Sequence, residues 1–160
     1  RLGLGMAFQR PPQLEGVSVR GFAAALNADD ALNAHAKALD LADFAERDVV
    51  VGFSGGEIKR WEVLKLFLQS PDFLLIDEPE SGVDLEHIAA VGNAVNTLVA
   101  QPARDGTRRS ALLITHTGLI LDHVRAHQAH LMRAGRMLHT GPAQNLLAHI
   151  RTQGYVAPAA

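Results

Sequence analysis

Apolar residues along the chain form two kinds of pattern, short unbroken runs and longer stretches with helical spacing. Residues 73–76 and 111–114 are wholly apolar runs, which are typical of strands buried on both faces of a parallel sheet. Between them, residues 85–99 place Ile88, Val91, Val95 and Leu98 on one side of a helix. Strand, helix and strand in this order predict a βαβ unit in an α/β fold with a parallel core sheet.

A capping signal marks the start of the helix before the first of these strands. Ser54 is a good N-cap residue, and Glu57 follows it at the spacing of a capping box. Helical spacing then continues through Ile58, Trp61, Leu64 and Leu68, and a proline at position 71 closes the stretch. We therefore expect a helix over residues 55–69.

The remaining pattern predicts one strand, a helical insert, a hairpin and two further helices. The strand ends at residue 8, and a loop begins at Gln9, because Pro11 and Pro12 forbid an immediate helix. Residues 19–46 are rich in Ala, Leu, Asp and Asn, and Leu32, Leu39 and Phe44 mark an apolar face of that insert. We expect helices near residues 119–125 and 143–151, and a hairpin over residues 130–139.

Composition narrows the classes of protein to which the chain can belong. With 160 residues, 48% of them hydrophobic, the chain is long enough for one domain or a large piece of one. Its 15 basic and 17 acidic residues are spread evenly, which gives no attraction for nucleic acid. The chain has no cysteine, no signal-peptide pattern at its start and no apolar run that approaches a membrane span. We expect a cytoplasmic protein that binds no nucleic acid and does not insert into a membrane.

Polar residues follow three of the predicted strands, at the edge where open parallel sheets bind ligands. These are Gln9, the pair Asp77 and Glu78, and His116. An acidic pair after a buried strand suits phosphoryl chemistry, in which one carboxylate holds Mg²⁺ through water and the other orients the attacking water. Acidic residues at strand ends also serve as helix caps and loop solvators, so the pair alone leaves both interpretations open.

Ser54, Gly55 and Gly56 offer backbone N–H groups at a helix start, where the peptide dipoles favour an anion such as a terminal phosphate. A plain capping box explains Ser54 and Glu57 equally well. The order of the motifs favours the first interpretation. The motifs are FSGGE at 53–57, FLLIDE at 73–78, SGVD at 81–84 and TH at 115–116, and they resemble the ABC ATPase family in register.

This resemblance implies a P-loop NTPase fold of the ABC ATPase type and a role for each site residue. Glu78 would be the general base or water orienter, and Asp77 would bind Mg²⁺ through water. Gln9, similar to the Q-loop glutamine, would sense the metal and the γ-phosphate of ATP, while His116, similar to the switch histidine, would position the attacking water. The signature residues Ser54, Gly55, Gly56 and Glu57 and the D-loop residue Asp84 would meet the ATP held by the other subunit of an ATP-dependent homodimer.

One motif of that family does not occur: the chain holds no G-x-x-x-x-G-K-[ST] string, and residues 3–5 lack its lysine and its spacing. We expect this Walker A loop upstream of Arg1, so that residues 1–160 form the C-terminal two thirds of one ABC ATPase domain. Residues 10–70 would carry the Q-loop, the helical subdomain and the signature helix. Residues 71–160 would carry the Walker B strand, the D-loop, the switch histidine and the C-terminal hairpin and helix. By itself this segment should not hydrolyse ATP. A degenerate subunit that only completes a partner's ATP site is the alternative.

Finer details resemble the ATPase subunit of the SUF iron–sulfur cluster assembly system. They include MAFQ at 6–9, GVS at 16–18 and a signature that ends in Glu57 and runs into the basic residues Lys59 and Arg60. This resemblance implies a motor on a soluble scaffold of two β-helical proteins of the SufB/SufD type. Proline at 79, Glu80 and Ile58 fit that subfamily less well, so a nucleotide-binding subunit of a membrane transporter stays an alternative. Lys59 and Arg60 could contact nucleotide or a partner, although a solvated helix surface explains them too.

Overall fold

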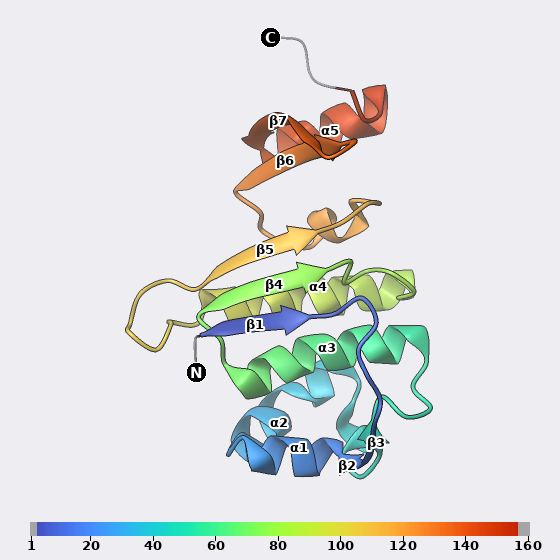
Figure 1. Ribbon diagram of the computed structural model, residues 1–160, viewed down its shortest axis with the longest axis vertical. Coiled ribbons are helices and arrows are strands. Elements are labelled where there is room, and N and C mark those ends of the chain that lie inside the picture. Colours follow the sequence, from blue (N-terminus) through green and yellow to red (C-terminus); the bar gives the residue numbers. More distant parts are fainter. Residues whose placement is uncertain (1–2, 157–160) are drawn as a thin grey trace.

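A parallel sheet of three strands lies at the centre of the computed structural model, which describes residues 3–156 (Figure 1). The strands are β1 (Leu4–Ala7), β4 (Phe73–Asp77) and β5 (Ser110–Ile114), in the order β1-β4-β5. Residue 75 of β4 lies opposite residue 6 of β1 and residue 112 of β5. Helix α4 (Leu85–Ala100) connects β4 to β5, so the predicted βαβ unit is confirmed.

The sheet buries one face against helices. Leu74 and Ile76 of β4 are fully buried, and they belong to one core with the predicted apolar stripe of α4. On the opposite face the apolar side chains are exposed; they are Leu4, Met6, Phe73, Leu112 and Ile114. The prediction of strands buried on both faces is therefore wrong for the described residues. Alternate side chains of a strand point to opposite faces, and here the helices cover only one of them.

The helical insert over residues 19–46 is confirmed, and it consists of two helices of 7 residues and two short 3₁₀ turns. Helices α1 (Val19–Ala25) and α2 (Asp29–His35) are followed by the 3₁₀ turns η1 (Lys37–Leu39) and η2 (Ala42–Phe44). Leu32 and Leu39 are buried as expected, and the half-buried Phe44 ring packs edge-on against Phe53, with 5.0 Å between the ring centres. An antiparallel pair that the pattern did not predict, β2 (Leu14–Ser18) with β3 (Asp48–Val49), closes the base of the insert.

Helix α3 (Gly55–Gln69) has the predicted bounds and both predicted capping bonds. The Glu57 amide donates to the Ser54 hydroxyl at 3.3 Å, and the Ser54 amide donates to the Glu57 carboxylate at 2.6 Å. The helix stops after Gln69, because the C-cap residue Ser70 has a left-handed φ of 47°. All side chains from position 59 to position 68 are buried, because α3 lies between the sheet, the helical insert and α4 (Figure 1).

After β5 the chain forms a short turn instead of the expected helix over residues 119–125. The 3₁₀ turn η3 (Leu119–Asp122) stops three residues early. Asn96 of α4 supplies the reason, since its side-chain amide donates to the His123 carbonyl at 2.7 Å and accepts from the Arg125 amide at 2.8 Å. These side-chain bonds take the place of helical backbone bonds.

The C-terminal part forms a hairpin followed by a helix, as predicted. Strands β6 (Gln128–Arg133) and β7 (Arg136–Pro142) turn at Ala134 and Gly135, whose φ angles of 49° and 73° are typical of a type I′ hairpin. Helix α5 (Ala143–Gln153) packs on this hairpin and on η3. No helix in the described range is both long enough and apolar enough to cross a membrane.

Candidate active site

Three of the predicted site residues meet at the carboxyl edge of the sheet. The Gln9 side-chain amide, just after β1, donates to Glu78 Oε2 at 2.7 Å. The His116 ring, just after β5, lies with Nδ1 at 2.9 Å from Glu78 Oε1. Glu78 itself follows β4, the central strand. Each oxygen of one carboxylate therefore has its own partner, and the three residues come from three neighbouring strands.

The backbone turns sharply at Glu78. Its φ of 46° is left-handed, which non-glycine residues adopt rarely and at an energetic cost. The Glu78 amide donates to the Ile114 carbonyl of β5 at 2.9 Å, which holds the turn against the neighbouring strand. A strained backbone at the end of a central strand is typical of residues whose side chain must face a ligand.

Asp77 occupies the last position of β4 and is half-buried. Its backbone carbonyl accepts a bond from the Lys59 ammonium at 3.3 Å. Its carboxylate makes no hydrogen bond or ion pair with another residue of the described range, so its oxygens are available to a cation or to water. Hard carboxylate oxygens are the ligands that Mg²⁺ prefers.

The basic residues after the signature motif are buried, so a solvated helix surface, one of the two explanations of the sequence pattern, is wrong. Lys59 is 4% exposed and Arg60 is 6% exposed, because α3 is enclosed on every side. Burial lowers the pKa of Lys59, and the negative charges of Asp77 and Glu78 oppose that shift. Lys59 therefore places a buried positive charge beside the acidic pair.

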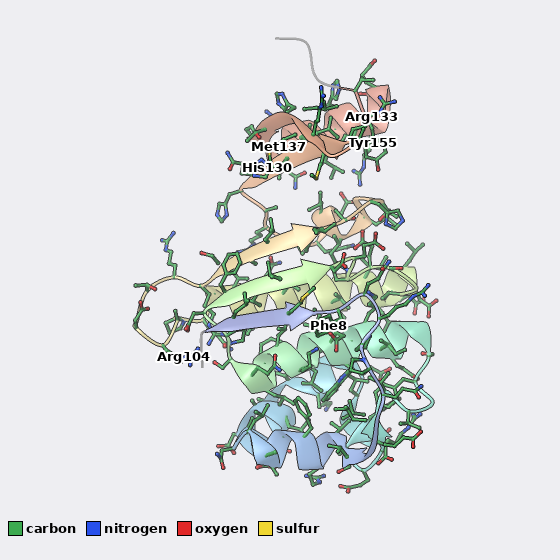
Figure 2. All side chains as sticks on the ribbon, in the orientation of Figure 1. Phe8, Arg104, His130, Arg133, Met137 and Tyr155 are labelled. Atoms are coloured by element: carbon green, nitrogen blue, oxygen red, sulfur yellow. The ribbon has the colours of Figure 1, made fainter. Side chains whose placement is uncertain are left out.

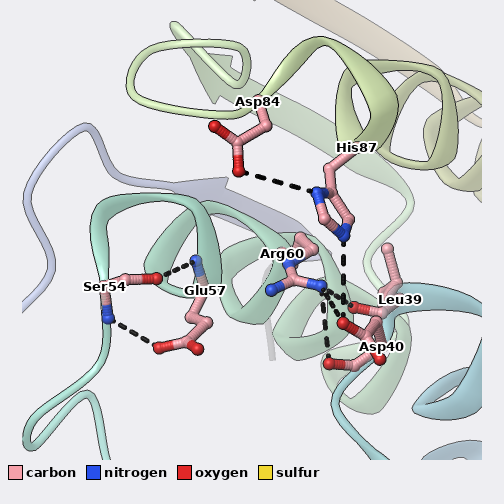
Figure 3. A network of polar contacts seen from close by, with 7 residues as sticks. All are labelled: Leu39, Asp40, Ser54, Glu57, Arg60, Asp84 and His87. Atoms are coloured by element: carbon pink, nitrogen blue, oxygen red, sulfur yellow. Dashed lines mark hydrogen bonds and ion pairs between the residues drawn. The ribbon is translucent and has the colours of Figure 1, made fainter.

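Arg60 ties α3 to the helical insert (Figure 3). Its guanidinium donates to the Asp40 carboxylate at 2.8 Å and to the Leu39 carbonyl at 3.3 Å. Hydrogen bonding to Arg60 and its positive charge lower the pKa of Asp40. His87 of α4 lies with Nε2 at 3.8 Å from the same carboxylate and with Nδ1 at 4.0 Å from Asp84.

The signature residues form a second group at the start of α3. Ser54 and Gly55 are exposed, whereas Gly56 and Glu57 are half-buried. The Gly82 carbonyl oxygen lies 3.5 Å from the position that a Cβ atom would take at Gly55 or Gly56, so the loop at Gly82 packs on the first turn of α3. Asp84 is exposed and is the N-cap residue of α4. Within residues 3–156, no hydrogen bond or ion pair links this group to Gln9, Glu78 or His116.

Glu80 is a buried carboxylate that the sequence did not single out as a site residue. It is 4% exposed, and its Oε1 accepts from the Thr117 hydroxyl at 2.8 Å and from the Thr115 hydroxyl. The two threonines flank His116. Glu80 therefore holds the side chains on both sides of the histidine, and no pattern signal distinguishes it from an ordinary loop carboxylate.

A buried ion pair in α3 holds the first residue after β1. The Glu62 carboxylate accepts from Lys65 Nζ at 2.6 and 2.7 Å, and it also accepts from the Phe8 amide at 2.5 Å. The Lys65 ammonium lies 4.8 Å from the centre of the Phe8 ring. Phe8 immediately precedes Gln9, so this pair anchors the loop that carries Gln9. Opposite charges at i and i+3 within the apolar second half of α3 are the signal by which the sequence could have shown it.

Comparisons with known proteins match one family over half of the chain. A family profile described as ABC transporter matches residues 1–81. The chain is 34% identical to the probable ATP-dependent transporter SufC of Escherichia coli K12, over 96% of this chain and 66% of that protein. It is 31% identical to the probable ATP-dependent transporter ycf16 of Trieres chinensis, over 96% of this chain and 65% of that protein.

A probable ABC transporter ATP-binding protein of Streptococcus pyogenes serotype M18 is 33% identical, over 97% of this chain and 64% of that protein. The chain thus spans about two thirds of the length of these curated relatives.

Solved structures show the same fold. A nucleotide-free ATP-binding cassette from an ABC transporter superposes with a TM-score of 0.68, covering 98% of this chain and 69% of that one at 20% identity. A bacterial Atm1-family ABC exporter with ATP bound superposes with a TM-score of 0.71, covering 97% of this chain and 28% of that one at 21% identity. At such identities the likeness concerns the fold alone, and the fold agrees with the predicted α/β class.

Proposed function

Because this chain belongs to the ABC transporter family, we propose that the full-length protein hydrolyses ATP with Glu78 as the carboxylate that orients the attacking water. The observation that carries the proposal is the bracketing of Glu78 by Gln9 at 2.7 Å and by His116 at 2.9 Å. A carboxylate held by an amide on one oxygen and an imidazole on the other has a fixed direction. Fixed direction is what general-base positioning of water requires.

The residues around Glu78 would bind the metal and the γ-phosphate. Asp77 and Gln9 would hold Mg²⁺ through water, and the metal when bound would neutralise phosphate charge. The Asp77 carboxylate fits this role because its oxygens have no protein partner in the described range. His116, exposed at the sheet edge, would hydrogen-bond the γ-phosphate and position water beside Glu78. Lys59 contributes a buried positive charge beside the acidic pair, and its ammonium donates to the Asp77 carbonyl at 3.3 Å.

The signature group would act across a homodimer. Ser54 and Gly55 are exposed at the N-terminus of the 15-residue helix α3, where backbone dipoles favour an anion. Glu57 lies in the first turn of the same helix, and Asp84 is the N-cap residue of α4. Gly82, two residues before Asp84, packs on Gly55 and Gly56. The group has no bond to the Glu78 cluster within the described chain, which supports service to the ATP of the other subunit. Hydrolysis would then depend on ATP-driven closure of the dimer.

Phosphate release by the full-length protein tests the catalytic proposal. Removing one preorganised electrostatic contributor commonly costs roughly 10²–10³ in rate, so His116→Ala and Gln9→Ala should each lower turnover strongly. His127→Ala is the matched control, because His127 is exposed and lies outside the cluster. If His116→Ala turns over ATP as fast as His127→Ala, the proposed role of His116 is wrong.

For the physiological role, we infer a motor for iron–sulfur cluster assembly on a SufB/SufD-type scaffold. The similarity to the SufC and ycf16 relatives supports this role. The similarity to the S. pyogenes relative supports the alternative of a transporter's nucleotide-binding subunit. Affinity purification of the tagged full-length protein from its own cells separates them. Recovery of two related scaffold proteins without a membrane subunit favours assembly, whereas a polytopic membrane protein as the stoichiometric partner refutes it.

A further inference from the structure

Tyr155 reaches back from the end of α5 to the loop that carries His116. Its hydroxyl donates a hydrogen bond to the backbone carbonyl of His116. We propose that Tyr155 is a positioning residue, which holds the backbone of His116 so that the imidazole faces Glu78. The inference rests on the proposed function, because it assigns Tyr155 an effect through the residue that positions the attacking water.

The segment around Tyr155 is itself fixed to the C-terminal unit. Gly154 ends α5 with a φ of 75°, and its amide donates to the Ile150 carbonyl at 2.9 Å. The Arg133 guanidinium of β6 donates to the Tyr155 carbonyl at 3.3 Å, and these two residues lie side by side near the end of α5 (Figure 2). The His149 ring is hydrogen-bonded through Nε2 to the Val156 carbonyl at 2.9 Å. Tyr155 therefore has backbone anchors on a helix and on a hairpin.

The hydroxyl of Tyr155 completes a set of restraints on three consecutive residues. Glu80 binds the hydroxyls of Thr115 and Thr117, which fixes the residues on either side of His116. Tyr155 binds the carbonyl of His116 itself. The imidazole is 63% exposed, and among residues 3–156 it has one side-chain partner, Glu78. An exposed side chain with a single bond depends on its backbone for its direction, so each backbone restraint affects where the imidazole points.

Tyr155→Phe is the sharpest perturbation, because it removes the hydroxyl and keeps the ring. One net hydrogen bond corresponds to a change of about 3- to 10-fold, so kcat for ATP hydrolysis by the full-length protein should fall by that factor. KM for ATP should change less than kcat, because the hydroxyl contacts only the His116 backbone and His116 is one of several groups proposed to contact the nucleotide. Val156→Ala, at the exposed neighbouring position, is the matched control and should leave both parameters unchanged.

A spectroscopic readout separates this inference from the proposed function. In the full-length protein, the imidazole resonance of His116 is identified by its loss in His116→Gln. Tyr155→Phe should shift or broaden that resonance, whereas Val156→Ala should not. An unchanged resonance in Tyr155→Phe overturns the positioning role, even if His116→Ala is inactive. A shifted resonance with unchanged kcat overturns the claim that Tyr155 contributes to turnover through His116, and His116→Ala alone then decides the catalytic role of His116.

Discussion

Breaking the ion pair between Glu62 and Lys65 should destabilise the protein far more than breaking an exposed pair. The side chains are 2% and 10% exposed, and the pair lies inside α3 with a shortest N–O distance of 2.6 Å. Glu62→Leu leaves the Lys65 ammonium buried without its counter-charge, which costs about 3–5 kcal/mol. It also leaves the Phe8 amide without its acceptor.

A double variant that replaces both Glu62 and Lys65 separates the cost of the unpaired charge from the loss of the ion pair. Replacing both members of a buried pair with apolar residues of similar size is often close to neutral. Glu62→Leu combined with Lys65→Met should therefore recover the part of the loss that comes from the unpaired Lys65 charge. A destabilisation of about 1–3 kcal/mol should remain, because the Phe8 amide is still unpaired in the double variant.

Thermal unfolding of the full-length protein, followed by circular dichroism without nucleotide, measures these differences. A loss of 3–5 kcal/mol corresponds to a fall in Tm of roughly 6–20 °C for a domain of this size class. Glu46→Gln, which breaks the exposed pair of Arg20 and Glu46, is the control and should barely shift Tm. The reasoning is refuted if Glu62→Leu behaves like Glu46→Gln, or if the double variant is no more stable than Glu62→Leu alone.

Two further predictions concern other buried polar groups. Glu80→Ala removes the acceptor of two threonine hydroxyls and should lower the unfolding free energy, measured by urea titration, by about 1–3 kcal/mol. Glu80→Gln keeps an acceptor oxygen and should lower the unfolding free energy less. Equal losses in the two variants contradict this explanation. Burial of His35 against Phe67 lowers its pKa from the ordinary 6.5. Between the lowered pKa of His35 in the folded protein and its pKa of 6.5 in the unfolded chain, the unfolded chain binds more protons. The contribution of neutral His35 to the unfolding free energy is therefore complete above pH 6.5 and is lost as pH falls toward the folded pKa. His35→Gln should remove that slope from Tm measured against pH, and an unchanged slope counts against the explanation.

Local signals explain why much of the fold could be predicted from the sequence. The Ser54–Glu57 capping box and a closing proline set both ends of α3, since capping depends on residues adjacent in the chain. The predicted hairpin over residues 130–139 is equally local, since its turn depends only on Ala134 and Gly135. The convergence of Gln9, Glu78 and His116 also followed from sequence, because the carboxyl ends of parallel strands share one edge of the sheet.

Features set by contacts between distant segments could not be predicted. The early end of η3 depends on Asn96, a side chain of α4 that captures backbone groups which a helix would otherwise use. The burial of Lys59 and Arg60 depends on elements that surround α3 on every side. The exposure of one sheet face depends on which side the helices take, and periodicity within a strand carries no information on that choice.

The most direct test of the account is to separate ATP binding from ATP hydrolysis with Glu78→Gln in the full-length protein. Glu86→Gln, an exposed acidic position in the first turn of α4, is the matched control. Titration with a fluorescent ATP analogue gives Kd, and phosphate release gives turnover. We expect unchanged affinity, with turnover lowered by roughly 10²–10³ for Glu78→Gln alone. Turnover equal to that of Glu86→Gln would contradict the assignment of Glu78 as the hydrolytic carboxylate.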